Sequence, residues 1–481
     1  MTRNVKAFFW TIFDKVGIQL FTFVIGIFLA RLLTPFDYGV VGLSTIFIAI
    51  TDILIESGFS NALIRKQDRN QIDLSTAFLF NTTISVVIYS VLFVVSPYIA
   101  VFFDSPLLSP VLRLVGINVL FNSLCVVQNA LFIAEFRLKI LAIINFFSLL
   151  PSGVIAVIMA FNGYGVYALV VQSVFSSFIR LVLLWYYAKW RPSFVFSKKS
   201  FDYLWGFGSK LILTRFIGVF FNKINTFIIG KYIGKSDLGF YSKAESLSSQ
   251  PDSIISGVIT KVAVPILSEC QQDTNRLLDC FRKYSKLLTL AICLICGLLC
   301  LIAKPLILLL WTDKWSDTII IFRILLMASI LSPLSALNLI LLQVLNKTSV
   351  SLKLEILKKA IYVPIIILGA IYGLLGLAFA QILISIVAFI VNSSASQRYI
   401  HYSYYTQYVD VLIYILPMLV SIVLLFSLVN NMLVSNLFFS IIVGAFSYIF
   451  VFSFFLYLIK DWVFLEYSNI LFSFLKSKIV E

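Results

Sequence analysis

Apolar stretches about twenty residues long follow one another along nearly the whole of this 481-residue chain. A helix of roughly 20 predominantly apolar residues is long enough to cross the hydrocarbon core of a bilayer. Hydrophobic residues make up 60% of the sequence, charged residues 12%, and the mean hydropathy is +1.01. These values lie far outside the range of soluble domains. The sequence therefore predicts an all-α polytopic membrane protein.

Length and hydropathy predict about 14 spans. Six precede a polar, basic break at residues 189–199, six follow it, and two more lie near the C-terminus. The predicted domains are an N lobe (1–200), a second lobe (201–400), and a part (401–481) that holds the last two spans and an amphipathic interfacial tail. The predicted spans are 9–33, 39–57, 75–101, 111–134, 140–161, 164–188, 205–233, 239–260, 285–310, 318–343, 356–373, 376–395, 410–429 and 436–459.

Basic residues gather on alternate connections between these spans. If the N-terminus is cytoplasmic, only Lys231, Lys235 and Lys314 fall in external connections. Cytoplasmic loops carry an excess of Lys and Arg, so both termini are predicted to be cytoplasmic. This distribution explains most of the net charge of +15 without a nucleic-acid partner. The basic N-terminus superficially resembles a signal peptide, but no small-residue cleavage site follows, so we expect a retained first helix.

One motif occurs twice, 200 positions apart, at Ala30–Gly39 and at Gly230–Gly239. Each copy has a small residue, a cation and two apolar residues, then a turn that ends in Asp-apolar-Gly. Many transporters build two halves around a shared path across the bilayer by internal duplication. The repeat predicts two pseudo-symmetric six-helix bundles in a chain that moves a substrate.

The sequence contains little evidence of a catalytic site. The external connections are short, and the largest internal loop, near Lys261–Tyr284, is too short for a catalytic domain. His401 has no nucleophile beside it in the sequence, so no catalytic residue is assigned. Cys293, Cys296 and Cys300 lack an accompanying His or carboxylate, which favours packing over a metal site. No nucleotide-binding glycine loop occurs, so we expect no cofactor.

Cations within the spans are the first candidates for substrate binding, because embedded charges usually face a cavity or a partner. Lys15 in the first span matches Arg215 in the seventh, which adds Lys210 and Lys223. Arg180 lies in the cytoplasmic third of the sixth span. Snorkelling to the headgroups is the alternative for Lys15, Lys210 and Arg215, and an interfacial anchor is the alternative for Arg180. A cavity-facing role is favoured for Lys223, near the middle of its span.

Embedded carboxylates are candidates for gating or ion coupling. Asp14 lies in the first span, Asp52 and Glu56 share one face of the second, and Glu245 and Asp252 lie in the eighth. Such groups exchange protons or bind sodium ions in coupled transporters. Neutralising the nearby cations is the alternative, and both interpretations remain open.

Arg31 and Lys231 end the paired first and seventh spans, and each is followed by an Asp-apolar-Gly turn. A cation at a helix C-terminus is stabilised by the helix dipole, and Asp37 and Asp237 suit the start of the next helix. Capping is favoured here, and gating of the external mouth is the alternative.

Two segments resemble a known family. Residues from Gly26 to Gly39 resemble the first-helix signature of bacterial polysaccharide transporters, and so do residues from Gly239 through Pro251 to Gln271. The chain thus resembles the Wzx-type flippases of the multidrug, oligosaccharidyl-lipid and polysaccharide exporter superfamily. The predicted span count, the two halves and the extra pair agree along the whole chain.

The resemblance implies two six-helix lobes that form a V, as in multidrug exporters of the superfamily, around a cavity that opens to either side in turn. It implies translocation of an undecaprenyl-pyrophosphate-linked oligosaccharide (an O-antigen, capsule or exopolysaccharide unit) across the bacterial cytoplasmic membrane. Lys15, Arg215 and Lys223 would line the cavity, since a pyrophosphate needs cations in a low-dielectric path. Coupling to an H⁺ or Na⁺ gradient is also expected, and so are contacts with membrane lipid, a glycan polymerase and a chain-length regulator.

Two other functions are weighed. A multidrug exporter of the same superfamily is the first, although cationic drugs should prefer a more acidic cavity. A membrane enzyme, such as a glycan polymerase or a lipid-dependent glycosyltransferase, is the second, and it is disfavoured by the short external connections.

Overall fold

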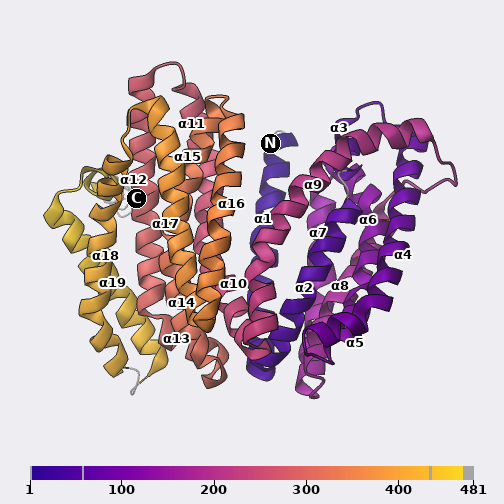
Figure 1. Cartoon of the computed structure of the whole chain (residues 1–481), viewed down its shortest axis with the longest axis horizontal. Helices are drawn as coiled ribbons and strands as arrows, with labels where there is room; N and C mark the ends of the chain where they lie inside the picture. The colour runs from indigo at the N-terminus through magenta and orange to yellow at the C-terminus, as the bar shows by residue number, and fades with distance from the viewer. Residues whose placement is uncertain (1–2, 57–58, 433–435, 470–481) are drawn as a thin grey trace, which may run out of the picture. The chain divides into compact units, whose positions relative to one another are not determined.

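The computed structural model describes residues 3–56, 59–432 and 436–469, and within these the side chains of all but 3–16, 56, 207–211, 213, 214, 258 and 432. The described part is almost wholly helical and contains no strand. Its contacts divide the chain into two compact units, Met1–Gly239 and Phe240–Glu481. Figure 1 shows long helices running side by side within each unit.

The first unit is built from the helices of the first six predicted spans and from the seventh, α9, which packs on α2, α3 and α4. The sequence places the domain boundary near residue 200, at the polar, basic break of residues 189–199, whereas the contacts place it after Gly239. The two divisions rest on different criteria, so the three predicted domains stay a prediction. The helices are α1 (Arg3–Leu32), α2 (Pro35–Glu56), α3 (Phe59–Arg65), α4 (Gln71–Phe102), α5 (Leu108–Val115), α6 (Ile117–Ala134), α7 (Leu138–Phe161), α8 (Val166–Tyr187), α9 (Lys198–Ile228), the π-helix η1 (Ile229–Ile233) and the start of α10 (Lys235–Val258).

The second unit continues α10 and closes with the helix pair that has no counterpart in the first. Its central helix, α12, packs against α14, α15, α18 and α19. The elements are η2 (Ile259–Ala263), α11 (Val264–Glu269), α12 (Thr274–Leu301), α13 (Ala303–Trp311), η3 (Asp313–Trp315), α14 (Ser316–Ser329), α15 (Ser332–Val344), α16 (Thr348–Ile371), α17 (Gly373–Ile400), α18 (Tyr404–Met432) and α19 (Leu437–Ile459).

The described residues include 11 helices that are long and apolar enough to cross a membrane. The remaining predicted spans correspond to α1, α9 and α16, which are also long helices. Every predicted span thus has a helical counterpart, and the multi-pass all-α fold is confirmed, with the number 14 as an approximate count.

Two predicted features differ in detail. The predicted loop over Lys261–Tyr284 is largely helical, because η2 and α11 extend α10 and α12 begins at Thr274. The fourth, ninth and tenth predicted spans are each broken, at Gly116 between α5 and α6, at Ile302 between α12 and α13, and after Ser329 between α14 and α15. Pro333 at the start of α15 has no amide hydrogen to continue the α14 ladder, which explains the break between α14 and α15.

The repeated motif forms a close helix crossing within the first unit. A Cβ at Gly39 in α2 would overlap the backbone carbonyl of Lys235 in α10. Reciprocally, a Cβ at Gly239 in α10 would overlap the carbonyl of Pro35 in α2. Glycine allows two backbones to touch in this way. The last residue of each copy of the motif is therefore glycine because its backbone touches the backbone of the other copy.

The C-terminal pair is tied to α12 by a buried ionic network. The Arg282 guanidinium donates to the Asp410 carboxylate of α18 at 2.7 and 3.0 Å. Lys286, 4% exposed, lies 3.2 Å from Asp410 and 3.7 Å from Asp461. Of the predicted interfacial tail, residues 462–469 are helical and the rest lies outside the described residues. Its position in the interface stays a prediction.

Candidate functional site

A polar cavity of about 180 Å³ lies inside the first unit. It brings together three predicted site residues from three helices: Asp52 of α2, Arg180 of α8 and Arg215 of α9. Asn122 and Asn129 of α6 add carboxamides from one helical face, since they are two turns apart. The remaining lining residues are Ile55, Ser60, Asn61, Cys125 and Val126.

The charges of this cavity favour an anion. Two guanidinium groups and one carboxylate line it, and the buried Nε of Arg180 has no hydrogen-bond partner. Guanidinium groups bind carboxylate and phosphate oxygens through paired hydrogen bonds. An unpaired buried donor is unfavourable by about 1–3 kcal/mol, so an anion or water at this position would stabilise the site.

Lys223 occupies a different position. It is half-buried on α9, and its Nζ donates to the Thr45 hydroxyl of α2 at 3.1 Å, outside the cavity lining. The structure thus groups Arg215 with Arg180 and Asp52 rather than with Lys223. The side chains of Lys15, Lys210, Asp14 and Glu56 lie outside the described residues, and their predicted roles stay predictions.

Among the helix-end residues, Asp37 makes the contacts expected at the start of a helix. The Asp37 carboxylate accepts from the Thr34 amide at 2.9 Å and from the Thr34 hydroxyl, which closes the turn before α2. Arg31 is exposed in the last turn of α1. Lys231 instead pairs with Asp104 at 2.9 Å, and this ammonium group holds the pKa of Asp104 below its ordinary value.

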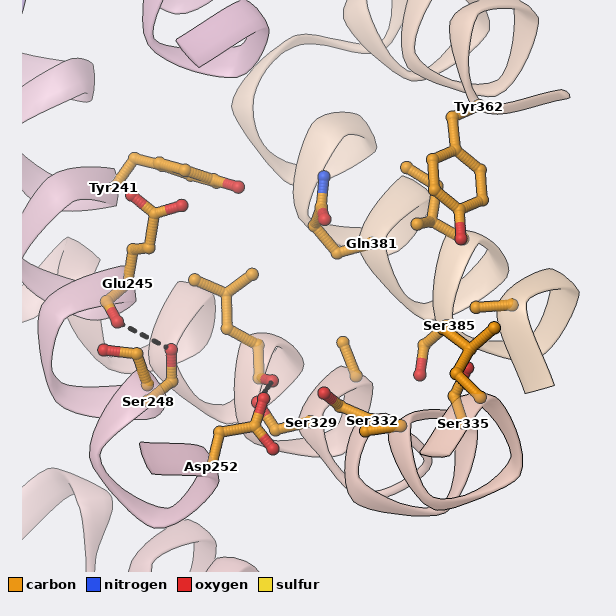
Figure 2. Close-up of a pocket in the computed structure, with 17 residues that line it drawn as sticks. Tyr241, Glu245, Ser248, Asp252, Ser329, Ser332, Ser335, Tyr362, Gln381 and Ser385 are labelled. Carbon is orange, nitrogen blue, oxygen red and sulfur yellow. Dashed lines mark hydrogen bonds between the residues drawn. The ribbon is translucent and has the colours of Figure 1, made fainter. Parts of the chain in front are cut away.

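A second, larger cavity of about 450 Å³ lies inside the second unit, among α10, α14, α15, α16 and α17 (Figure 2). It contains two predicted residues, Glu245 and Asp252, which are two turns apart on α10. Figure 2 shows Asp252 beside Ser329 and Ser332. Hydroxyl groups dominate the rest of the polar lining, which comprises Ser248, Ser249, Ser329, Ser332, Ser335, Ser385, Tyr241, Tyr362 and Gln381.

Three polar atoms of this cavity are buried without a hydrogen-bond partner: Asp252 Oδ1, Gln381 Nε2 and Ser385 Oγ. By contrast, Ser248 and Ser329 donate to carbonyls of their own helices. Because one acceptor, one donor and one hydroxyl are unsatisfied together, the cavity suits a ligand that both donates and accepts hydrogen bonds.

Sequence reasoning missed the neutral polar residues of both cavities, because it searched for charges in apolar spans. A usable signal existed. Ser332 and Ser335 are three residues apart on α15, and Gln381 and Ser385 are four apart on α17, so each pair lies along one helical face. Asn122 and Asn129 show the same pattern in the first unit.

Comparisons with known proteins agree on one family. A family model described as "Polysaccharide biosynthesis protein" matches residues 28–320. The chain is 25% identical over 388 residues to an uncharacterized membrane protein in the cps region of Klebsiella pneumoniae, covering 78% of each chain. It is 25% identical over 325 residues to the succinoglycan biosynthesis transport protein ExoT of Rhizobium meliloti (strain 1021), covering 66% of this chain and 63% of ExoT.

The fold is similar to that of the lipid II flippase MurJ in an inward closed conformation. The TM-score is 0.71 at 12% sequence identity, and the similarity covers 94% of this chain and 100% of MurJ.

The long apolar helices and the polar cavities between them define a multi-pass, all-α membrane protein, and its fold is similar to that of a flippase. The chain belongs to the family of polysaccharide biosynthesis proteins, because the family model matches more than half of its length. Its resemblance to the Wzx-type polysaccharide transporters is thereby confirmed.

Proposed function

We propose that this protein flips a polyprenyl-pyrophosphate-linked oligosaccharide across the bacterial cytoplasmic membrane by alternating access. The oligosaccharide would be a repeat unit of an O-antigen, a capsule or an exopolysaccharide. The relatives support this class of substrate, since one of them is named for succinoglycan biosynthesis and another for the cps region. Both termini would be cytoplasmic, as the distribution of basic residues predicts.

The anion-binding cavity of the first unit carries the proposal. A pyrophosphate group must leave water to cross the bilayer, and that step requires compensating charge and hydrogen bonds. Arg180 and Arg215 supply the charge, and Asn122 and Asn129 supply neutral donors. The Arg180 Nε that lacks a protein partner is a donor available to a phosphate oxygen.

We further propose that an H⁺ or Na⁺ gradient drives the cycle through Asp252. Its Oδ1 is buried and unpartnered in the second cavity. The ionisable groups that share its surroundings are Glu245 and Tyr241 on α10, Tyr362 on α16 and Cys296 on α12. A cation or proton that binds Asp252 removes an acceptor from the cavity and thus weakens any ligand bonded to that oxygen, as linkage requires.

The test is a flipping assay in proteoliposomes with a fluorescent polyprenyl-pyrophosphate-linked oligosaccharide purified from the host. The double substitution Arg180→Gln and Arg215→Gln should lower the initial rate at least about tenfold, because it removes two charge-assisted contacts. Lys199→Gln is the matched control, since Lys199 is an exposed cation of α9 away from the cavity. Equal rates for the double variant and wild type would contradict the anion site, and no flipping by wild type would contradict the function.

A further inference from the structure

The cavity of the second unit differs in chemistry from an anion site. Among its described lining residues there is no Lys, Arg or His, and its carboxylic acids are Glu245 and Asp252. An acidic lining that offers no basic side chain to a ligand disfavours a phosphate group, because like charges in a low-dielectric site are unfavourable. This cavity therefore selects against the charged part of a lipid-linked glycan.

The lining suits a neutral, hydroxylated ring. Its volume of about 450 Å³ falls within the ~300–1,000 Å³ range of small-ligand pockets. A sugar hydroxyl donates and accepts at once, which matches the unpartnered oxygen of Asp252, the unpartnered amide nitrogen of Gln381 and the hydroxyl of Ser385.

Apolar groups stand beside these polar atoms. Tyr241 and Tyr362 line the cavity from α10 and α16 (Figure 2). Leu325, Leu339 and Ile384 add aliphatic surface to the lining. A sugar ring presents C–H faces between its hydroxyls, so a mixed aromatic and hydroxyl lining can contact both kinds of surface.

We propose that this cavity, formed by α10, α14, α15, α16 and α17, is a glycan-binding site that holds uncharged sugar residues of the transported substrate. The proposal rests on the proposed function and gives the substrate a second point of recognition, separate from its pyrophosphate. Asp252 accepts a hydrogen bond from a sugar hydroxyl, Gln381 donates one, and Ser385 does either. A site built to pair with hydroxyl groups discriminates strongly against ligands that lack them.

Saturation-transfer NMR on the full-length protein tests the site. The probe is the phosphate-free oligosaccharide that mild acid releases from the polyprenyl carrier of the host. The detergent carries no sugar headgroup, so it does not compete. Wild type should transfer magnetisation to the sugar ring protons, and the double substitution Gln381→Leu and Ser385→Ala should weaken binding by about 3- to 30-fold, because two hydrogen-bonding groups are lost.

Ser393→Ala is the matched control on the same helix, since Ser393 is buried, donates to the Ile390 carbonyl and does not line the cavity. It should bind the oligosaccharide as wild type does, and equal thermal unfolding of all variants shows that they fold. Inorganic pyrophosphate, added as a second probe, should bind the double variant unchanged.

The outcomes separate the two proposals. Absence of binding to wild type, or equal binding by the double variant, overturns the glycan site, even if flipping of the lipid-linked substrate is intact. Displacement of the oligosaccharide by inorganic pyrophosphate overturns it too, because the two would then share one site. Loss of flipping in wild type overturns the proposed function instead.

Discussion

At the scale of single residues, function depends on which polar groups inside the helices find a partner in the protein. Lys223 has one in the Thr45 hydroxyl, whereas the Arg180 Nε and the Asp252 Oδ1 have none. In the sequence, all three residues are charges within apolar spans. Their hydrogen bonds distinguish them, because only Arg180 and Asp252 have a buried polar atom that a ligand could pair with.

The Lys231–Asp104 pair makes a pH-dependent contribution to stability. Lys231 lowers the pKa of Asp104 from its ordinary 3.8, so the folded state binds the Asp104 proton less readily than the unfolded state. The pair therefore stabilises the fold above pH 3.8, and its contribution is lost as the pH falls through the lowered pKa. We expect Asp104→Asn to lower the unfolding temperature at pH 7 and to match wild type at the acid end of a pH series.

Asp68→Asn, at an exposed loop position, is the control, and its difference in unfolding temperature from wild type should not disappear at acid pH in this way. A difference between Asp104→Asn and wild type that is the same at every pH would contradict the assignment.

At the scale of helices, close approach and buried charge hold the elements together in different ways. The α2–α10 crossing depends on the absence of a Cβ at Gly39 and Gly239. The contact of α12 with α18 includes two ion pairs, in which Arg282 and Lys286 share the buried Asp410 carboxylate. Each arrangement gives a specific mutational prediction.

Gly39→Ala should destabilise the protein by about 1–3 kcal/mol, because the added methyl meets a backbone carbonyl that cannot move aside alone. Gly26→Ala is the control, since no atom lies within 4 Å of a Cβ at that position of α1. It should be neutral or stabilising by up to about 1 kcal/mol, because Ala favours a helix more than Gly does. Thermal unfolding in detergent compares the two, and equal effects would argue against the close crossing.

Lys286→Met should destabilise the second unit by about 3–5 kcal/mol, because it leaves the buried Asp410 and Asp461 with one cation fewer. Lys283→Met removes a pair with Glu466 whose side chains are 36% and 40% exposed, and it should matter by less than about 1 kcal/mol. Chemical denaturation measures both substitutions. A larger effect at Lys283 than at Lys286 would contradict the role of the buried network.

At the scale of the whole molecule, each unit encloses its own polar cavity, and the two cavities differ in charge. The first is lined by two arginines and one aspartate, and the second by two acids and several hydroxyls. If the substrate is a pyrophosphate joined to neutral sugars, the pyrophosphate suits the first cavity and the sugars suit the second. A drug-like cation has a suitable partner only in the acidic cavity.

Transport in cells should reflect this difference. Deleting the gene in its own host should abolish the surface glycan and leave its lipid-linked precursor in the membrane, measured by glycan staining and by extraction of labelled lipids. Expression in a host that lacks multidrug pumps should give no increase in resistance to cationic drugs. Raised resistance with an unchanged surface glycan would favour the drug-exporter alternative instead.

The sequence alone determined that this chain crosses a membrane repeatedly. Hydropathy over about twenty residues is a local property of the sequence, and an apolar helix of that length spans the hydrocarbon core of a bilayer. It also made Asp52, Arg180, Arg215, Glu245 and Asp252 candidates for function, since charges in apolar spans are conspicuous. Only the tertiary structure decided which of these groups share a cavity, that Lys223 is paired with Thr45, and that neutral residues such as Gln381 and Ser385 complete a site. The physical reason is that a cavity is formed by faces of helices far apart in the chain, and the rotation of each helix about its axis is set by packing against its neighbours.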